Sequence, residues 1–347
     1  FIEWNRRWDE WLAGWSANEV VVDFTSGTKP MSAAAALLAI ARGTAAVSYV
    51  TGERDDTGRV CRSTGIQSIT PALVTAHRQL RLAVEHFHAG NYAAARDIAG
   101  AYRKINDLKD DHLRKVALSI HYLGTACEAW DRFDYRAAYA AMHDSHKFWK
   151  DWSWVDSSER LEDNKAIIHQ AREACGKQAF SPPLAADLLA NARRCMAREA
   201  WDDAVARLYR ACELLAQIVL LQQFQVKTAD IDTVKLPQEL RETYEQKRGH
   251  DGKVKLGLRE SYCLLEKLGH ALGREFIACY GVHPKYKDLH NRLEKRNQSL
   301  LAHGVTPIGK DDAEALLRHV EALARIADPS ILDEWLPRAN PVRFRVF

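Results

Sequence analysis

From about Thr75 almost to its C-terminus, the chain has amphipathic helical patterns and no strand pattern of any strength. Apolar residues recur there at the three- and four-residue spacing of helices that bury one face. Strand-like runs occur only nearer the N-terminus. The sequence therefore predicts a mainly α protein in which any sheet lies within residues 1–74.

The first 74 residues predict a small α/β portion. A β-branched run at residues 20–24 is followed by a loop, a helix over residues 31–42 and a second strand at residues 47–51. This order is typical of a parallel crossover in a Rossmann-like sheet, with the loop at the carboxyl edge. Before it, tryptophans at helical spacing predict a helix face that packs against a neighbouring sheet: Trp4, Trp8, Trp11 and Trp15. A membrane-surface helix is the alternative, which the acidic residues on the polar face disfavour.

Three similar segments predict tight turns between paired helices, at residues 87–95, 130–138 and, more loosely, 197–204. An aromatic residue and alanines in each segment let two helices approach closely. The spacing is irregular, so we expect a connector with about two tetratricopeptide-like hairpins over residues 75–180 and no regular solenoid. The Pro182-Pro183 pair then interrupts the helices and predicts an all-α domain over residues 181–347.

The composition is that of a globular protein and narrows the classes of function. In 347 residues the net charge is only +3, so contact with a nucleic acid requires a local basic patch. The seven cysteines are scattered without zinc-ligand spacing, which indicates reduced thiols and a cytoplasmic location. No apolar run reaches the roughly 18 residues of a membrane span, so we expect no membrane partner. The chain begins at Phe1 without an initiator methionine, as a fragment of a longer protein would.

The candidate catalytic pair is Arg296 and His303 in the helical pattern over residues 289–303. At about 100° per residue, seven steps bring the two side chains within about 20° of each other on one helix face. Gly304 and Pro307 follow and are expected to end the helix, which places the imidazole beside the negative end of the helix dipole. That position favours the protonated form of His303.

These two groups are suited to RNA cleavage by its own 2′-hydroxyl. The imidazole can move protons, and the guanidinium can hold the phosphate with two hydrogen bonds, so no metal is needed. Four basic residues add a local approach for a polyanion: Lys285, Lys287, Arg292 and Lys295. Other arginine–histidine pairs with similar spacing occur in the chain, so a polar helix face with a C-terminal capping histidine stays open as the alternative.

A second candidate site is the loop between the predicted first strand and the following helix. Small residues let the backbone approach a ligand, and free amide groups at a helix N-terminus favour anions. The loop does not have the spacing of a Walker loop. A plain strand-to-helix turn is the alternative for its five residues, Thr25, Ser26, Gly27, Thr28 and Lys29.

The motif Arg296-Asn297-x-Ser299-x-x-Ala302-His303-Gly304 resembles the active-site motif of HEPN ribonucleases. A second segment, Trp201-Asp202-Asp203-Ala204 with the following Tyr209-Arg210-Ala211-x-Glu213, looks like the second helix of such domains. The segment from Asp23 to Met31 is similar to the Asp-x-Thr-Gly-Gly-Thr-Lys loop of CARF domains, the sensors of cyclic oligoadenylate. The chain thus resembles the CRISPR-associated CARF–HEPN ribonucleases of type III systems. Ser26 stands in place of a family glycine, and roughly the first half of the sensor domain has no counterpart.

The resemblance implies a cyclic-oligoadenylate-activated, metal-independent endoribonuclease that acts as a homodimer on single-stranded RNA. Its implied domains are a partial CARF sensor (1–74), a helical connector (75–180) and a HEPN domain (181–347). His303 would be the acid/base or orienting group, Arg296 the phosphate clamp and Asn297 the residue that sets local geometry; the loop over residues 25–29 would bind the activator. The alternatives are a non-catalytic CARF and helical-repeat binding scaffold, and a ring nuclease that degrades cyclic oligoadenylate at this loop.

Overall fold

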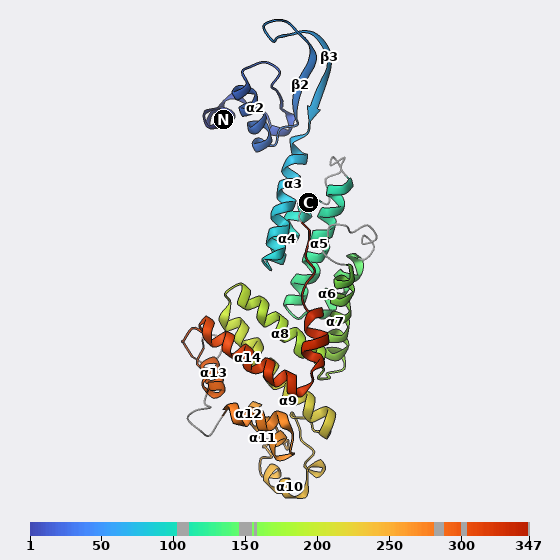
Figure 1. Cartoon of the computed structure of the whole chain (residues 1–347), viewed down its shortest axis with the longest axis vertical. Helices are drawn as coiled ribbons and strands as arrows, with labels where there is room; N and C mark the ends of the chain where they lie inside the picture. The colour runs from blue at the N-terminus through green and yellow to red at the C-terminus, as the bar shows by residue number, and fades with distance from the viewer. Residues whose placement is uncertain (103–110, 146–154, 156–157, 281–287, 300–303, 346–347) are drawn as a thin grey trace. The chain divides into compact units, whose positions relative to one another are not determined.

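The computed structural model describes residues 1–102, 111–145, 155, 158–280, 288–299 and 304–345 (Figure 1). The chain forms two compact units, one made mainly of Phe1–Thr125 and the other mainly of Ala126–His146 and Val155–Arg343. Most described residues are helical, and strands occur in the first unit. The predicted mainly α fold with a small N-terminal α/β portion is therefore confirmed. None of the helices in the described ranges combines the length and apolarity needed to cross a bilayer.

The sheet of the first unit has three strands in the order β1-β2-β3, with β1 at Val21–Asp23, β2 at Ala46–Arg54 and β3 at Val60–Ile69. β1 and β2 are parallel, and α2 (Lys29–Arg42) connects them as the sequence predicted. β3 pairs antiparallel with β2 as a hairpin (Figure 1). The sequence did not predict β3, because its side chains are largely polar and exposed and carry no alternating apolar pattern.

The tryptophan stripe of the first helix does not pack as predicted. α1 covers Ile2–Trp11, but of the four tryptophans only Trp8 is buried, and the Trp11 and Trp15 side chains are exposed. The partner of α1 is α2: the Arg42 guanidinium donates to the Asn5 side chain at 2.8 Å and lies over the Trp8 ring. A helix face that rests on one arginine stem buries little apolar surface, which leaves Trp11 and Trp15 in solvent.

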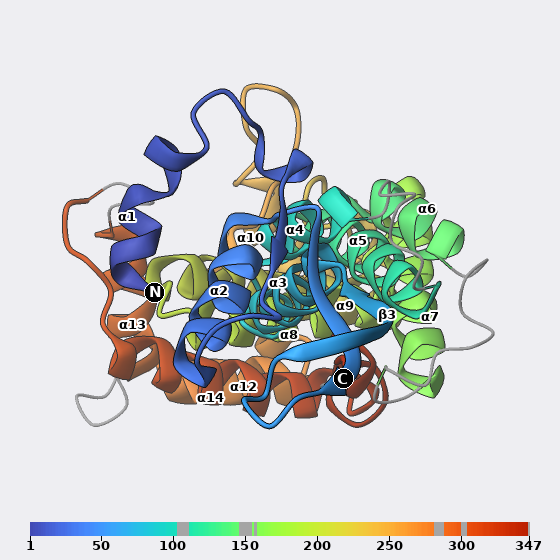
Figure 2. The same cartoon turned by 90° about the horizontal axis from the view of Figure 1, so that it is seen from above.

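The helices that follow pack as antiparallel pairs. In the first unit α3 packs on α4, and the rings of Phe87, Tyr92 and Phe344 meet edge to face. In the second unit α6 packs on α7, and α9 packs on α8, α11 and α14 (Figures 1 and 2). The bounds before the Pro182-Pro183 pair are α3 Pro71–His88, α4 Tyr92–Tyr102, α5 Asp111–Asp131, α6 Tyr135–Ser145 and α7 Ser158–Gly176. Those after it are α8 Pro182–Ala197, α9 Trp201–Phe224, α10 Gln238–Glu245, α11 Leu258–Lys267, α12 Ala271–Tyr280, α13 Asp288–Asn297, α14 Lys310–Ala327 and α15 Leu336–Arg338. Short helical turns lie at Ala17–Glu19, Thr233–Lys235 and Ile331–Trp335.

The three repeated segments are tight helix–helix turns of one kind. Each places one residue in the left-handed region two positions before the next helix: Gly90, Phe133 and Glu199, with φ of 77°, 61° and 59°. The residue after it donates its N–H to a carbonyl five residues back, as Ala200 does to Cys195 at 2.9 Å. This bond satisfies a carbonyl at the helix end. The left-handed residue thus sets where each second helix begins.

Glu199→Gly is expected to stabilise the second unit, because glycine adopts a positive φ without the steric cost that glutamate meets. The expected gain in the free energy of unfolding is about 0.5–1 kcal/mol. Urea denaturation of both proteins measures it. Glu162→Gly, inside α7, is the matched control and should destabilise by about 1 kcal/mol. If the two substitutions change the free energy of unfolding in the same direction, this explanation of the turn is contradicted.

Candidate functional site

Arg296 lies at the C-terminal end of α13 and is held against α9. Its guanidinium carbon is 4.4 Å from the centre of the Tyr209 ring, a distance at which the ring face attracts a cation. Its Nη1 also donates to Oδ1 of the neighbouring Asn297 at 3.2 Å. Both Arg296 and Asn297 are half-buried. A guanidinium fixed in this way keeps donors that can turn to a phosphate.

Glu213 adds a carboxylate to the same place, one helical turn after Tyr209 on α9. Burial raises the pKa of Glu213, whereas the nearby charges of Arg210 and Arg296 lower it. Arg210 is also its ion-pair partner, with 3.5 Å between Nη1 and Oε2. Tyr209 and Glu213 belong to a segment that resembles a family motif, but no role in the site was predicted for them. Their spacing of four residues, which places both on one helix face, was the signal that could have found them.

The predicted continuous helix over residues 289–303 is wrong, because α13 ends at Asn297. Beyond it the chain turns back: the Gly304 N–H donates to the Ser299 carbonyl at 3.1 Å, and the Thr306 N–H donates to the Gln298 carbonyl at 3.1 Å. A Cβ at position 304 would collide with the Gln298 backbone, so glycine is required there. Asparagine and serine side chains compete for backbone hydrogen bonds and weaken a helix at such a point.

The expected alignment of Arg296 with His303 on one helix face therefore has no basis in helix geometry. His303 itself lies outside the described residues. The described residues on either side of that gap, Ser299 and Gly304, are joined by the hydrogen bond given above. This hydrogen bond brings Gly304 beside Ser299, two residues after the end of α13.

Asp202, in the first turn of α9, anchors the segment that follows Gly304. Its Oδ2 accepts the N–H of Ile308 at 3.2 Å, and Ile308 is itself buried. α9 thus carries the anchor of this segment in its first turn, and Tyr209 and Glu213 along its length. Asp202 of the family motif acts here as a structural support.

Part of the predicted basic approach is neutralised. Arg292 and Lys295 both reach Asp312 at the start of α14, at 3.1 and 2.8 Å. These pairs orient α13 on α14 and leave less free positive charge for a polyanion. Lys285 and Lys287 lie outside the described residues.

The loop over residues 25–29 lies at the carboxyl end of β1 and leads directly into α2, as predicted. Thr25 is bound to the sheet, because its Oγ1 accepts the Val50 N–H at 2.7 Å and its own N–H donates to Asp23 at 2.9 Å. Ser26, Gly27, Thr28 and Lys29 are exposed, with φ of 134° at Gly27. Exposed amides and hydroxyls beside a helix N-terminus can accept an anion. No described contact ties the Lys29 side chain to a fixed position, and its role as a ligand residue stays a prediction.

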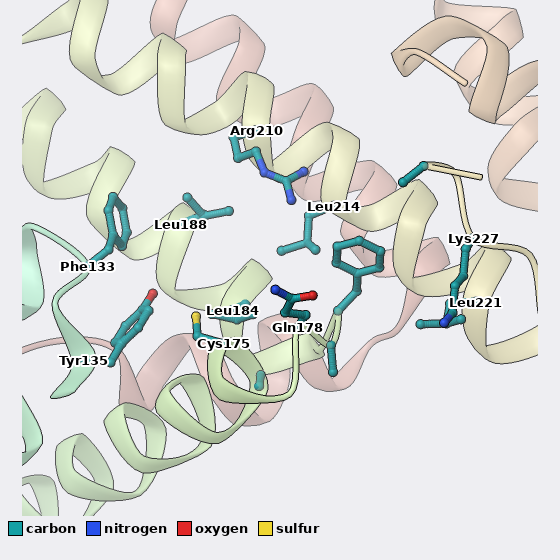
Figure 3. Close-up of a pocket in the computed structure, with 14 residues that line it drawn as sticks. Phe133, Tyr135, Cys175, Gln178, Leu184, Leu188, Arg210, Leu214, Leu221 and Lys227 are labelled. Atoms are coloured by element: carbon teal, nitrogen blue, oxygen red, sulfur yellow. The ribbon is translucent and has the colours of Figure 1, made fainter. Parts of the chain in front are cut away.

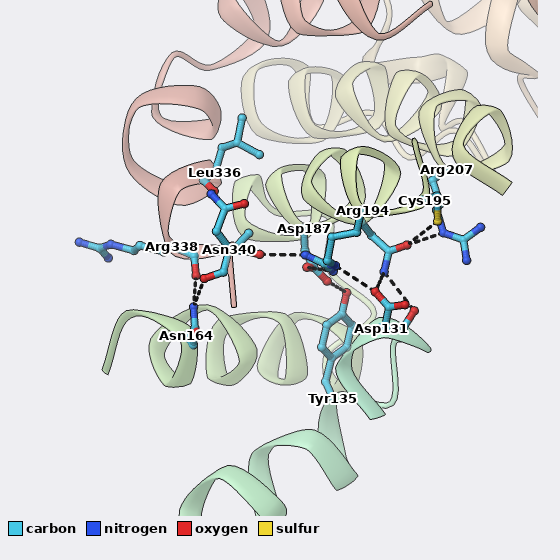
Figure 4. A network of polar contacts seen from close by, with 12 residues as sticks. Asp131, Tyr135, Asn164, Asp187, Arg194, Cys195, Arg207, Leu336, Arg338 and Asn340 are labelled. Atoms are coloured by element: carbon cyan, nitrogen blue, oxygen red, sulfur yellow. Dashed lines mark hydrogen bonds and ion pairs between the residues drawn. The ribbon is translucent and has the colours of Figure 1, made fainter. Parts of the chain in front are cut away.

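A buried polar network supports the second unit (Figure 4). Asp131, at the end of α5, accepts hydrogen bonds from two residues of α8 and from the residue directly after that helix. These are Asn191 at 3.0 Å, Arg194 at 2.9 Å and Arg198 at 2.9 Å. The fully buried Asp187 of α8 accepts the Tyr135 hydroxyl at 2.7 Å. These contacts fix the turn before α6 against α8, the helix that packs on α9.

Asp187→Asn is expected to flatten the pH dependence of stability. Burial raises the pKa of Asp187 to about 6, well above the value of an exposed aspartate, so its ionised form is disfavoured in the folded state. Its contribution to stability is full below the unfolded pKa and is lost as the pH rises through about 6. Unfolding by urea at a series of pH values measures the effect. Relative to the variant, the free energy of unfolding of the parent should fall by up to roughly 3 kcal/mol between about pH 4 and 7. If the free energies of unfolding of the two proteins change with pH in parallel, the prediction is contradicted.

The site is an arginine held over a tyrosine, with a glutamate nearby, on helices α13 and α9. Residues 172–327 match the family model of the Csm6 HEPN domain. This part of the chain is thus similar to the Csm6 HEPN domain, in agreement with the resemblance of the motifs around Arg296 and Tyr209. It contains Tyr209, Glu213 and Arg296.

Two further comparisons concern the whole chain. No curated protein matches it. Among solved structures it is similar to Enterococcus italicus Csm6 bound to cyclic hexa-2′-fluoro-hexa-dAMP, with 11% sequence identity and a TM-score of 0.45. That alignment covers 97% of this chain and 77% of the other.

Proposed function

We propose that this protein is an endoribonuclease that cleaves single-stranded RNA at a site centred on Arg296. The observation that carries the proposal is the position of the Arg296 guanidinium, 4.4 Å from the Tyr209 ring centre, inside a Csm6 HEPN domain. The ring and the nearby Glu213 hold the cation from one side. Its remaining donors can then grip a phosphate whose negative charge grows during reaction.

The chemistry needs proton transfer and charge neutralisation. The 2′-hydroxyl of the RNA loses its proton and attacks the adjacent phosphorus, the bond to the 5′-oxygen of the next nucleotide breaks, and that oxygen gains a proton. One fragment then ends in a 2′,3′-cyclic phosphate and the other in a 5′-hydroxyl. In this proposal His303 moves or orients the protons, Arg296 binds the phosphate, and Asn297, which accepts from Arg296, sets the direction of the guanidinium.

We further propose that two copies of the chain form the working enzyme, with the two Arg296 sites facing one RNA strand. A single guanidinium on the Tyr209 side neutralises only part of the phosphate charge, and a second copy would supply the other part. The described residues gather no second free arginine at the site, since Arg292 and Arg210 pair with Asp312 and Glu213.

Cleavage of a fluorescent single-stranded RNA by the parent and by His303→Ala tests the assignment. The variant should cut at least about a hundredfold more slowly, the usual contribution of a positioned acid or base. His319→Ala, at a histidine of α14 in the same domain, is the matched control and should keep the parent rate within about twofold. Equal rates for the parent and His303→Ala would refute the assignment.

A cyclic oligoadenylate of type III CRISPR systems is the proposed activator, bound at the loop over residues 25–29. The support is the exposed loop at the carboxyl end of β1 and its position directly before α2. Lys29→Ala should reduce stimulation of RNA cleavage at limiting activator by about tenfold, because one charge-assisted phosphate contact is lost. Unstimulated cleavage should not change. Lys115→Ala, a lysine of the same unit paired with Asp111, serves as control; equal losses in both variants would contradict the loop assignment.

A further inference from the structure

A cavity of about 550 Å³ lies in the second unit, between the turn that precedes α6, the end of α7, and helices α8 and α9 (Figure 3). Neither the RNA site nor the loop over residues 25–29 uses it. Cavities of this size hold small molecules in many proteins. Most of its lining is apolar or aromatic, including Phe133, Phe180, Leu184, Leu188 and Leu214.

The charged residues among its described lining are both cations, Arg210 and Lys227. Hydrogen bonds link the segments that carry them: Arg210 donates to Gln217 at 2.9 Å, and Gln217 donates at 3.3 Å to Thr228, the neighbour of Lys227. Figure 3 shows the Arg210 and Lys227 side chains at separate places along the cavity. Its described lining thus carries two cations and no carboxylate, which is complementary to an anion.

The opposite end is apolar. Figure 3 shows Phe133 and Tyr135 at the end away from Lys227. The Tyr135 hydroxyl is already committed to Asp187, so this residue presents its ring to the cavity and has no spare donor. With few polar groups available to read the edges of a nucleobase, the lining fits an acyl or aryl body better than a nucleotide.

We propose that this cavity binds a small carboxylate with an apolar body, its carboxylate on Arg210 and its body among Phe133, Leu184 and Leu188, while Lys227 attracts the anion from another part of the cavity. Arg210 also forms the ion pair with Glu213, the carboxylate beside Arg296. A bound anion competes with Glu213 for this arginine. The cavity is therefore a binding site of its own that shares one residue with the surroundings of the RNA site.

Protection of Cys175 from alkylation measures occupancy, because this exposed thiol lines the cavity. Octanoate is the probe, and octanol and octylamine are the neutral and cationic controls of equal chain length. Mass spectrometry measures the extent of alkylation of each cysteine. Octanoate should slow alkylation of Cys175 and leave the exposed Cys61 unchanged. Octylamine should not protect. The arms with octanoate, octanol and octylamine contain no RNA, so their outcome is independent of cleavage.

Two variants test the two ends of the site. Lys227→Gln should weaken octanoate binding about fivefold, as expected for an exposed charge pair, and Leu188→Glu should weaken it at least about tenfold. Lys253→Gln, at an exposed lysine of the same unit, is the control and should not change it. Lys227→Gln alters an exposed side chain, so its result holds even if Leu188→Glu unfolds, which thermal melting would reveal.

The proposal is overturned if octanoate gives no protection, if octylamine protects Cys175 equally, or if Lys227→Gln binds octanoate as tightly as the parent. Protection by a short RNA that octanoate cannot displace would also overturn it, because the cavity would then be a subsite for a base.

Discussion

Arg296→Ala should lower the rate of RNA cleavage roughly a thousandfold, the usual cost of removing a preorganised group that stabilises developing negative charge. The side chain is half-buried at the end of α13 and rests on Tyr209, so it is positioned before RNA binds. The loss should appear mainly in kcat, because the guanidinium binds the phosphate most strongly when its charge is highest. Single-turnover cleavage with excess enzyme measures the chemical step directly.

Arg296→Lys and Arg325→Ala complete this experiment. Lysine keeps the charge but has no planar fork for two hydrogen bonds, so Arg296→Lys should recover only part of the rate. Arg325 forms an exposed ion pair with Asp333 in the same domain, and its replacement should leave cleavage within about twofold of the parent. A parent-like rate for Arg296→Ala would remove Arg296 from the mechanism.

The second large effect is on stability, at Asp131. Asp131→Ala should lower the free energy of unfolding by about 3 kcal/mol, because two arginines lose their main acceptor in a poorly solvated place. The Arg194 and Arg198 side chains are only 12% and 25% exposed. Arg194 keeps its bond to the Ala339 carbonyl at 2.9 Å, which limits the loss.

Urea denaturation of Asp131→Ala and of Asp333→Ala measures this difference. Asp333 is also an aspartate paired with an arginine, but its side chain is 60% exposed. Its replacement should change the free energy of unfolding by less than about 1 kcal/mol. If the two variants are equally stable, the polar network does not hold the turn before α6 against α8.

Much of the fold could be predicted from the sequence, because it rests on local patterns. Thr28, Pro30 and Gly43 specify the beginning and end of α2, and the flanking β-branched runs became the parallel strands β1 and β2. β3 could not be predicted in this way, since an exposed hairpin strand buries no alternating face. The tryptophan helix was predicted, but its packing was not, because periodicity shows that a face is apolar without showing what covers it.

The candidate site was predicted less completely. The identity of Arg296 and its family motif came from the sequence, but the helical angle used to place His303 assumed that α13 continues past Asn297. A turn held by backbone bonds from Gly304 and Thr306 depends on contacts between residues that periodicity does not join. The Tyr209 contact and the charge environment of Glu213 also arise only when α9 and α13 pack together.

The most direct test of the central claim is cleavage of a labelled single-stranded RNA by the purified protein with each cyclic oligoadenylate, in the presence of EDTA. We predict cleavage that depends on one of these activators, with products that end in a 2′,3′-cyclic phosphate. RNA left intact with every activator, or cut only after a divalent metal is added, would contradict the account.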